Sequence, residues 1–107
     1  MSISESLYFE SHITIDPVLE DDAKIGLLRV LVKGQGFRIA ELLMRNGSGE
    51  HSREDSFMTG RSKDLPDLSL RTQNLVTQLK EFGFRVRRYK IESALVDSKV
   101  ADTLNLL

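Results

Sequence analysis

The chain is poor in the residues that build disulfide-bonded, metal-binding and membrane-spanning proteins. It has no cysteine and only two histidines among its 107 residues, which excludes disulfides and thiolate-bound metals and argues against a dedicated metal site. The longest apolar run, at 27–32, is interrupted by Arg29 and is far shorter than the roughly 20 residues of a membrane span. The first residues lack the basic and apolar regions of a signal peptide. We therefore expect a protein of the reducing cytoplasm, without membrane contact, metal or other cofactor.

Neither sign of charge predominates, because the formal net charge at pH 7 is −1, which gives no overall attraction to nucleic acid or to anionic membranes. The length and the content of 40% hydrophobic and 29% charged residues suit one globular domain, 1–107, with its own core. Basic residues are nevertheless concentrated late in the chain, at Arg85, Arg87, Arg88 and Lys90. This concentration predicts either a solvated, charged edge strand or an anion-binding patch.

The most informative stretch is 8–16, Tyr-Phe-Glu-Ser-His-Ile-Thr-Ile-Asp, in which the side chains alternate in polarity. A period of two is typical of a half-buried strand. The face that includes Ile13 and Ile15 is mainly apolar and is expected to point into the core. The opposite face carries a carboxylate, an imidazole and a hydroxyl in a row, on Glu10, His12 and Thr14.

Apolar periodicity, together with cap and turn signals, predicts four strands and two helices. In chain order these are strand 8–16, helix 17–33, strand 37–45, strand 55–61, helix 65–82 and strand 84–92. Asp16-Pro17 is expected to begin the first helix, and Gly34 to end it in a left-handed conformation. Gly26 is interpreted as a close-packing point of that helix against the sheet. The tail from about 97 is expected to be either a short packed helix or a flexible end.

This order of elements predicts a ferredoxin-like α+β sandwich, with a four-stranded antiparallel sheet and both helices on one face. The first and third strands are expected to be central neighbours that run parallel. The row at His12 would then lie beside Phe57 and Thr59, on a sheet face that no helix covers.

The register of the last strand has two possible solutions. Alternation places Phe84 and Val86 in the core, but if it continues it buries Arg88 and exposes Tyr89 and Ile91. Either a bulge shifts the register near Arg87-Arg88, or the end of the strand extends past the core.

Phosphate or phosphoester chemistry is the first functional hypothesis for the open face. His12-Ile13-Thr14 is an H-x-T element, which places an acid/base and a hydroxyl donor two residues apart on one strand face. It resembles half of the signature of the 2H phosphoesterases, which use two such motifs on central strands. The matching tripeptide 57–59, Phe-Met-Thr, has no histidine, so a second imidazole would have to come from a homodimer.

Binding of RNA or another single strand is the second hypothesis. The strand order is similar to that of RNA-recognition motifs, which stack bases on aromatic residues of two strands. The residues expected to stack bases are Tyr8, His12 and Phe57, and those expected to contact phosphates are Arg61, Arg85 and Arg87. Against this, the stretch 56–60 lacks the aromatic pattern of that family, and Glu10 and Glu41 are acidic residues assigned to the same face.

Association with a protein partner or a second copy is the third hypothesis, and the one favoured for the chain as a whole. Tyr8, Ile39, Leu43 and Phe57 are apolar or aromatic residues assigned to the uncovered face, and exposed apolar patches mark partner surfaces.

Two further segments carry weaker signals. His51, with acidic neighbours, is interpreted as a solvated loop residue or a weak metal contact. Thr59-Gly60-Arg61-Ser62 precedes a predicted helix and is interpreted as either a plain turn or a small anion cradle.

Three blocks of sequence resemble a family of small ferredoxin-like proteins of bacteria and phages. They are Glu-Ser-His-Ile-Thr-Ile, Ser-Phe-Met-Thr-Gly-Arg and Arg-Tyr-Lys-Ile-Glu. The resemblance covers most of the chain. It implies that His12, Thr59, Arg61 and Lys90 belong to one set of blocks gathered on one sheet, and it implies no particular substrate.

The sequence therefore predicts a dimer or interaction module whose open face binds a phosphate-bearing ligand, a nucleotide or RNA. His12 is the candidate acid/base, assisted by the hydroxyl of Thr14. The candidate ligand-binding residues are Glu10, Thr59, Arg61 and Lys90.

Overall fold

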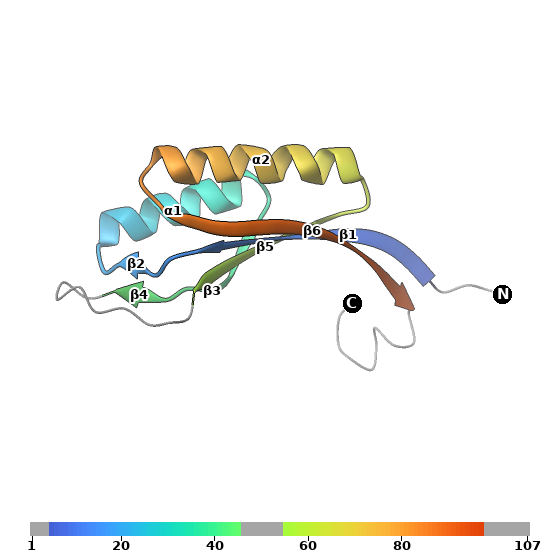
Figure 1. The fold of residues 1–107 in the computed structure, drawn as a ribbon, viewed down its shortest axis with the longest axis horizontal. Helices are drawn as coiled ribbons and strands as arrows, with labels where there is room; N and C mark the ends of the chain where they lie inside the picture. Colours follow the sequence, from blue (N-terminus) through green and yellow to red (C-terminus); the bar gives the residue numbers. More distant parts are fainter. Residues whose placement is uncertain (1–4, 46–54, 98–107) are drawn as a thin grey trace.

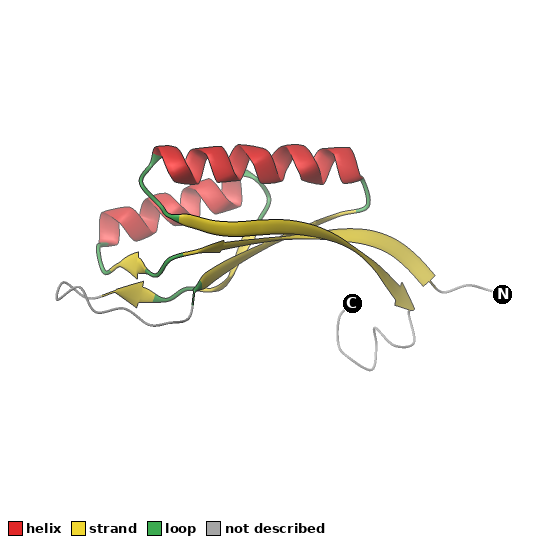
Figure 2. Ribbon diagram, in the orientation of Figure 1, coloured by secondary structure: helices red, strands yellow, loops and turns green. Residues whose placement is uncertain are grey.

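A four-stranded sheet with two helices on one face forms the body of the protein (Figures 1 and 2). The computed structural model describes residues 5–45 and 55–97. Its elements are β1 (Glu5–Ile15), β2 (Val18–Leu19), α1 (Asp22–Gly34), β3 (Arg38–Glu41), β4 (Met44–Arg45), β5 (Ser56–Ser62), α2 (Leu65–Glu81) and β6 (Val86–Asp97). The main sheet has the order β3-β5-β1-β6 and every pairing in it is antiparallel. The predicted α+β class with an antiparallel sheet is confirmed. His51 and the tail beyond 97 lie outside the described residues.

The central strands β1 and β5 are neighbours, as predicted, but they run antiparallel, so the prediction of a parallel pair was wrong. His12 lies opposite Thr59, and Thr14 lies opposite Phe57. The reason is the direction of β3. It is antiparallel to β5, as two strands joined by a chain reversal must be, and it therefore runs in the same direction as β1. The strand that follows the reversal, β5, must then oppose β1.

The first helix begins at Asp22, five residues later than predicted. Residues 18–20 instead form strand hydrogen bonds with a distant segment: the Val18 N–H donates to the Leu43 carbonyl at 2.8 Å, and the Glu20 N–H donates to the Arg45 carbonyl at 2.9 Å. These bonds belong to the two-stranded parallel sheet β2–β4. A helix through 18–20 would lose them, and this tertiary pairing overrides the local Asp-Pro signal.

Asp21, and not Asp16, caps the first helix. Its Oδ1 accepts hydrogen bonds from the N–H groups of Ala23 at 2.9 Å and Lys24 at 3.2 Å, which satisfies two of the free donors at a helix start. The helix continues through Gly34, and the residue in the left-handed conformation is Gly36, with φ 71°. Gly26 is exposed, and a Cβ there would meet nothing within 4 Å, so the packing role predicted for it was wrong.

The predicted strand 37–45 is divided into β3 and β4. The register of β3 against β5 shifts between Ile39 and Glu41, and the chain then leaves the main sheet for β2. Ser56 fixes this departure, because its hydroxyl accepts from the Leu43 N–H at 2.8 Å and lies 3.2 Å from the Leu43 carbonyl. Ile39 lies opposite Met58 and packs against the core. The prediction that Ile39 belongs to the open face was therefore wrong.

The second helix matches its prediction closely, since α2 spans Leu65–Glu81 and Asp64 caps it by accepting from the Asp67 N–H at 3.2 Å. Its inward face is closed off from solvent. Leu68, Leu75 and Leu79 are fully buried in one cluster with Ile13, Ile15 and Met58 from the sheet. Full burial of such a side chain contributes about 1.5–3 kcal/mol, and this packing holds one sheet face against the helices.

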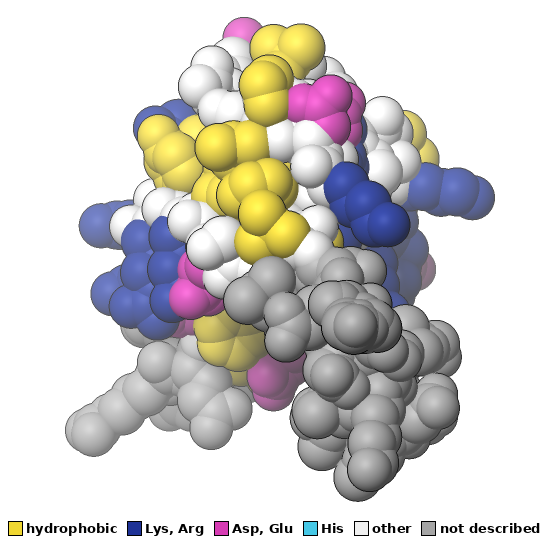
Figure 3. Space-filling view, turned by 90° about the vertical axis from the view of Figure 1, so that its right-hand side faces the viewer, with side chains coloured by type: hydrophobic (Ala, Val, Ile, Leu, Met, Phe, Trp, Pro, Cys, Tyr) yellow, Lys and Arg dark blue, Asp and Glu magenta, His cyan; other side chains and the backbone are white. Residues whose placement is uncertain are grey.

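Hydrophobic side chains also gather at the end of the molecule where β1 and α2 begin (Figure 3). In these two elements Leu7 and Leu65 are 52% and 42% exposed. Neither helix in the described part of the chain has the length and apolar character of a membrane span.

Candidate ligand-binding site

The open sheet face acquires its positive charge from a register shift between β1 and β6. Ile15 lies opposite Val86, but Thr14 lies opposite Arg88, so Arg87 is an extra residue in the ladder. The first of the two solutions for this strand, a bulge at Arg87, is therefore confirmed. A one-residue shift exchanges the two faces of a strand. It moves Ile91 to the helix side, where it packs against the core, and it moves Arg88 to the face of Thr14.

Arg87 is held at the bulge by two carboxylates. Its Nη1 donates to Asp16 Oδ1 at 2.9 Å, and its Nε lies 3.7 Å from Asp55 Oδ1. The hydrogen bond to Asp16, followed by the charges of Asp55 and Asp16, raises the pKa of Arg87 above its ordinary value. Arg85 Nε also pairs with Asp16, at 3.5 Å. Two of the three arginines predicted to contact RNA phosphates, Arg85 and Arg87, are thus engaged by acidic side chains.

A shallow depression of about 350 Å³ lies on the open face between β3, β5, β1 and β6. We call it the open-face depression. Its lining residues are His12, Thr14, Ala40, Phe57, Thr59, Arg88, Lys90 and Glu92. With histidine neutral, this lining carries two positive charges and one negative charge. Phe57 and Ala40 add an apolar section, so the depression presents both cations and an aromatic ring.

His12 sits among oxygen atoms on three sides. Its Nε2 lies 3.4 Å from Glu10 Oε2 and 3.4 Å from Glu92 Oε1, and its Nδ1 lies 3.5 Å from Thr59 Oγ1. The side chain is 32% exposed. These neighbours orient the imidazole and occupy both ring nitrogens. Within 5–45 and 55–97, no group of three or more potential ligand side chains is arranged to hold a metal ion.

Glu10 and Arg61 pair with each other at the flank of the depression, with Arg61 Nε 2.7 Å from Glu10 Oε1. The Arg61 guanidinium also lies 5.8 Å from the centre of the Tyr8 ring, within the range of a cation–π contact. Neither residue lines the depression. Of the six predicted site residues, the structure gathers His12, Thr14, Thr59 and Lys90, and places the other two beside them.

The lining residues that the sequence reasoning did not assign to the site are Ala40, Arg88 and Glu92. Ala40 faces the depression because its neighbour Ile39 packs against the core, and Arg88 because of the bulge in β6. The only signal for Arg88 was the conflict in alternation after Val86, which left the bulge as one of two solutions. Thr14 lies on this face but is only 4% exposed. It therefore forms part of the bottom of the depression and is not an accessible hydrogen-bond donor.

Neither of the two interpretations of 59–62, a plain turn or a small anion cradle, agrees with the structure. This segment continues β5 to Ser62 and pairs with residues 9–12 of β1. Gly60 serves close packing, because a Cβ at this position would lie 2.7 Å from the Phe37 ring.

Comparison with known proteins identifies no relative of established function. No family model and no curated protein matches the chain. A solved structure described as "De novo designed protein Foldit4" is similar to it at 10% identity and a TM-score of 0.41, over 86% of this chain and 96% of that one. The site must therefore be interpreted from its own geometry.

Proposed function

We propose that this protein is a binding module whose open-face depression takes a phosphate-bearing ligand. The position of Arg88 supports this most directly, since it lines the depression beside Thr14. Over the described ranges, Arg88 forms no ion pair, whereas Arg61, Arg85 and Arg87 do. A guanidinium without a carboxylate partner can donate two parallel hydrogen bonds to a phosphate, the bidentate geometry in which arginine is strongest.

Lys90 supplies the second cation. It lies opposite His12 on β6, and its Nζ is 3.5 Å from Glu92 Oε1. Both side chains of that pair are more than half exposed, and exposed ion pairs contribute little to stability. A phosphate can therefore compete with Glu92 for the ammonium group. Two cations facing one depression favour an anion with more than one charged oxygen.

Phe57 and Ala40 favour a ligand that also has a flat apolar part. The Phe57 ring is half-buried in the lining, and aromatic side chains of this kind stack on nucleobases. Arg88 and Lys90 lie on β6, two strands away from Phe57 on β5. A ligand whose aromatic ring stacks on Phe57 while its phosphate contacts β6 would be a nucleotide, or one nucleotide of an RNA strand.

His12 is proposed to line the ligand site, held by its own neighbours at both ring nitrogens, and not to act as an acid/base. Its Nε2 faces two carboxylates that an incoming phosphate would have to displace. Two-histidine phosphoester chemistry would need a second imidazole, and His12 is the only histidine among the lining residues. A phosphoesterase formed by two copies is the alternative, and product formation would distinguish it from simple binding.

Association with a second copy or with a protein partner is the second candidate function, favoured by β6. This strand of 12 residues is at the edge of the main sheet, and an edge strand presents unpaired N–H and C=O groups to another chain. Light scattering would support this candidate by a dimeric mass and contradict self-association by a monomeric mass.

We also propose that the fold belongs to the ferredoxin-like class and that the protein works in the cytoplasm. The order β3-β5-β1-β6, with one helix after each of the first and third strands of the main sheet, supports the fold class. The absence of cysteine supports a reducing compartment.

An NMR titration of the ¹⁵N-labelled full chain tests the binding proposal. The probes are inorganic phosphate, adenosine monophosphate, adenosine and a short single-stranded RNA. The proposal expects shifts of the amides of His12, Thr59, Arg88 and Lys90 with the nucleotide, smaller shifts with phosphate and the smallest with adenosine. RNA that binds at least tenfold more tightly than the nucleotide would identify a strand-binding face. Absence of saturable shifts at these residues with every probe contradicts the proposal.

A further inference from the structure

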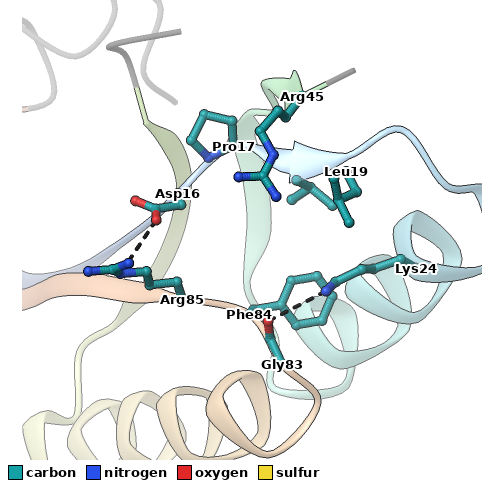
Figure 4. A pocket seen from close by; sticks show the side chains of 9 residues that line it. Asp16, Pro17, Leu19, Lys24, Arg45, Gly83, Phe84 and Arg85 are labelled. Atoms are coloured by element: carbon teal, nitrogen blue, oxygen red, sulfur yellow. Dashed lines mark hydrogen bonds and ion pairs between the residues drawn. The ribbon is translucent and has the colours of Figure 1, made fainter. Parts of the chain in front are cut away.

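A second pocket, of about 260 Å³, lies beside the small β2–β4 sheet and shares no lining residue with the open-face depression. We call it the Arg45 pocket, after the side chain that points into it (Figure 4). Its walls include Pro17, Leu19, Lys24, Arg45, Gly83 and Phe84. These residues come from β2, α1, β4 and the turn that follows α2. Three parts of the chain that are distant in sequence, 16–24, Arg45 and 83–85, thus converge on one concave site.

The positive charge of this pocket is only partly neutralised. Asp16 is the single acidic residue in the lining, and it already pairs with Arg85 at 3.5 Å and with Arg87 at 2.9 Å. Lys24 contacts uncharged groups: its Nζ lies 3.5 Å from the Gly83 carbonyl oxygen and 5.0 Å from the centre of the Phe84 ring. The charges of Lys24 and Arg45 are therefore left without a carboxylate inside the pocket.

Arg45 carries a donor that is shut away from water. Its Nε is buried, and no hydrogen-bond acceptor reaches it from within 5–45 and 55–97. A buried donor without a partner is destabilising, so an acceptor supplied by a ligand would be favourable here. The backbone of Arg45 is fixed by the β2–β4 ladder, since its carbonyl accepts from the Glu20 N–H at 2.9 Å. The guanidinium is thereby presented from a rigid element, directed between Pro17 and Leu19 (Figure 4).

The surrounding surface defines what would fit beside these two cations. Pro17, Leu19 and the ring of Phe84 give the pocket apolar walls (Figure 4). The volume is below the roughly 300–1,000 Å³ of pockets that hold drug-sized ligands, so only a small molecule fits. From the two cations in the lining, the unpartnered Nε and the apolar walls, we propose that the Arg45 pocket binds a small organic oxyanion. Its carboxylate or phosphate group lies between Arg45 and Lys24, and its apolar group packs against Phe84.

Titrations of the full-length protein with benzoate and with phenyl phosphate test this site. The two probes share an aromatic group and differ in the oxyanion, so their relative affinities show which anion the pocket prefers. The most direct signal is the Arg45 Nε–H resonance in ¹H–¹⁵N spectra, assigned by its disappearance in Arg45→Lys. Saturable movement of this resonance, together with the amides of Leu19 and Gly83, is the expected result. A resonance that does not move with either probe overturns the proposal.

Substitutions distinguish probe binding in the Arg45 pocket from probe binding on the open face. Arg45→Gln and Lys24→Gln are each expected to weaken binding of the better probe at least tenfold, and Arg88→Gln to leave it within twofold. If Arg45→Gln does not fold, the test uses Lys24→Gln and Arg45→Lys, because the first removes an ammonium that has no carboxylate partner in the pocket and the second keeps the charge. Unchanged affinity in Lys24→Gln, or equal loss in Arg88→Gln, contradicts a separate oxyanion site.

Discussion

Arg88 lies directly opposite Thr14 across the β1–β6 ladder, whereas the pair before it joins Val86 to Ile15. The extra residue between these two pairs decides which side chains of β6 face the open sheet surface. Without it, Thr14 would lie opposite Arg87, Arg88 would point to the helices and Tyr89 would occupy the place of Lys90. The cationic side of the open-face depression therefore depends on one bulge.

Deleting Arg87 is predicted to leave the fold and the open-face depression intact. The shortened strand places Val86 opposite Ile15, and the remaining arginine opposite Thr14, with no interruption of the ladder. Because 87 and 88 are both arginines, deletion of either gives the same protein. We expect cooperative urea unfolding and a nucleotide affinity within about threefold of the wild type.

Deletion of Tyr89 is the matched control for that variant. It keeps the bulge, moves Lys90 to the place of Tyr89, which is 50% exposed, and moves Glu92 to the place of Ile91, which packs against the core. A carboxylate in place of a packed isoleucine is unfavourable, so this variant is expected to be less stable than the wild type. Equal stability of the two deletion variants would show that the register of β6 is not set by the bulge.

Substitutions at two glycines are predicted to have opposite effects. A Cβ at Gly60 would lie 2.7 Å from the Phe37 ring, whereas a Cβ at Gly26 meets nothing within 4 Å. Gly60→Ala forces the buried ring to move and is expected to cost about 1–3 kcal/mol of unfolding free energy. Gly26→Ala removes a flexible residue from the exposed side of α1 and should add about 0.5–1 kcal/mol. Chemical denaturation measures both; a destabilised Gly26→Ala protein would contradict the packing at α1.

A buried hydroxyl pair links α2 to the centre of β1. The Thr72 hydroxyl lies 2.7 Å from both the Ser11 hydroxyl and the Leu68 carbonyl oxygen, and both side chains are buried. Since a hydroxyl has one proton, Thr72 donates to the carbonyl and accepts from Ser11. Thr72→Val leaves the Ser11 donor unpaired and is expected to cost about 1–3 kcal/mol.

A double-mutant cycle measures the interaction free energy between the Ser11 and Thr72 hydroxyls. The Ser11→Ala, Thr72→Val protein has no unpaired hydroxyl, and it should be more stable than the sum of the two single effects predicts. Additive free energies in the cycle would mean that the two hydroxyls do not interact in solution.

The sequence alone predicts correctly those elements whose signals lie in neighbouring residues. Asp64 and the apolar spacing from Leu68 to Leu79 predict α2 almost to the residue, because cap chemistry and helical periodicity agree there. The alternation at 9–15 predicts which face of β1 is buried, and Ile13 and Ile15 are indeed fully buried. Alternation assigned His12 and Thr14 to one face and the predicted strand order placed Thr59 beside them, whereas Lys90 was grouped with them only by the resemblance of its sequence block.

The remaining features depend on contacts between distant segments, which local patterns do not contain. Residues 18–20 carry the start signal of a helix, but their N–H groups are used by Leu43 and Arg45. The bulge at Arg87 is favoured by Asp16 and Asp55, neither of which is near it in sequence. Arg88 could therefore be assigned to the site only after the pairing of β6 with β1 was known.

The measurement that tests the central proposal most directly is the affinity of Arg88→Gln for adenosine monophosphate, by NMR titration or calorimetry. Its matched control is Arg29→Gln, which removes an exposed arginine from α1, away from the open face. Loss of a bidentate phosphate contact predicts a fall of about tenfold or more, or about 1.4 kcal/mol, in Arg88→Gln, and wild-type affinity in Arg29→Gln. Equal affinities of the two variants would contradict phosphate recognition by the open sheet face.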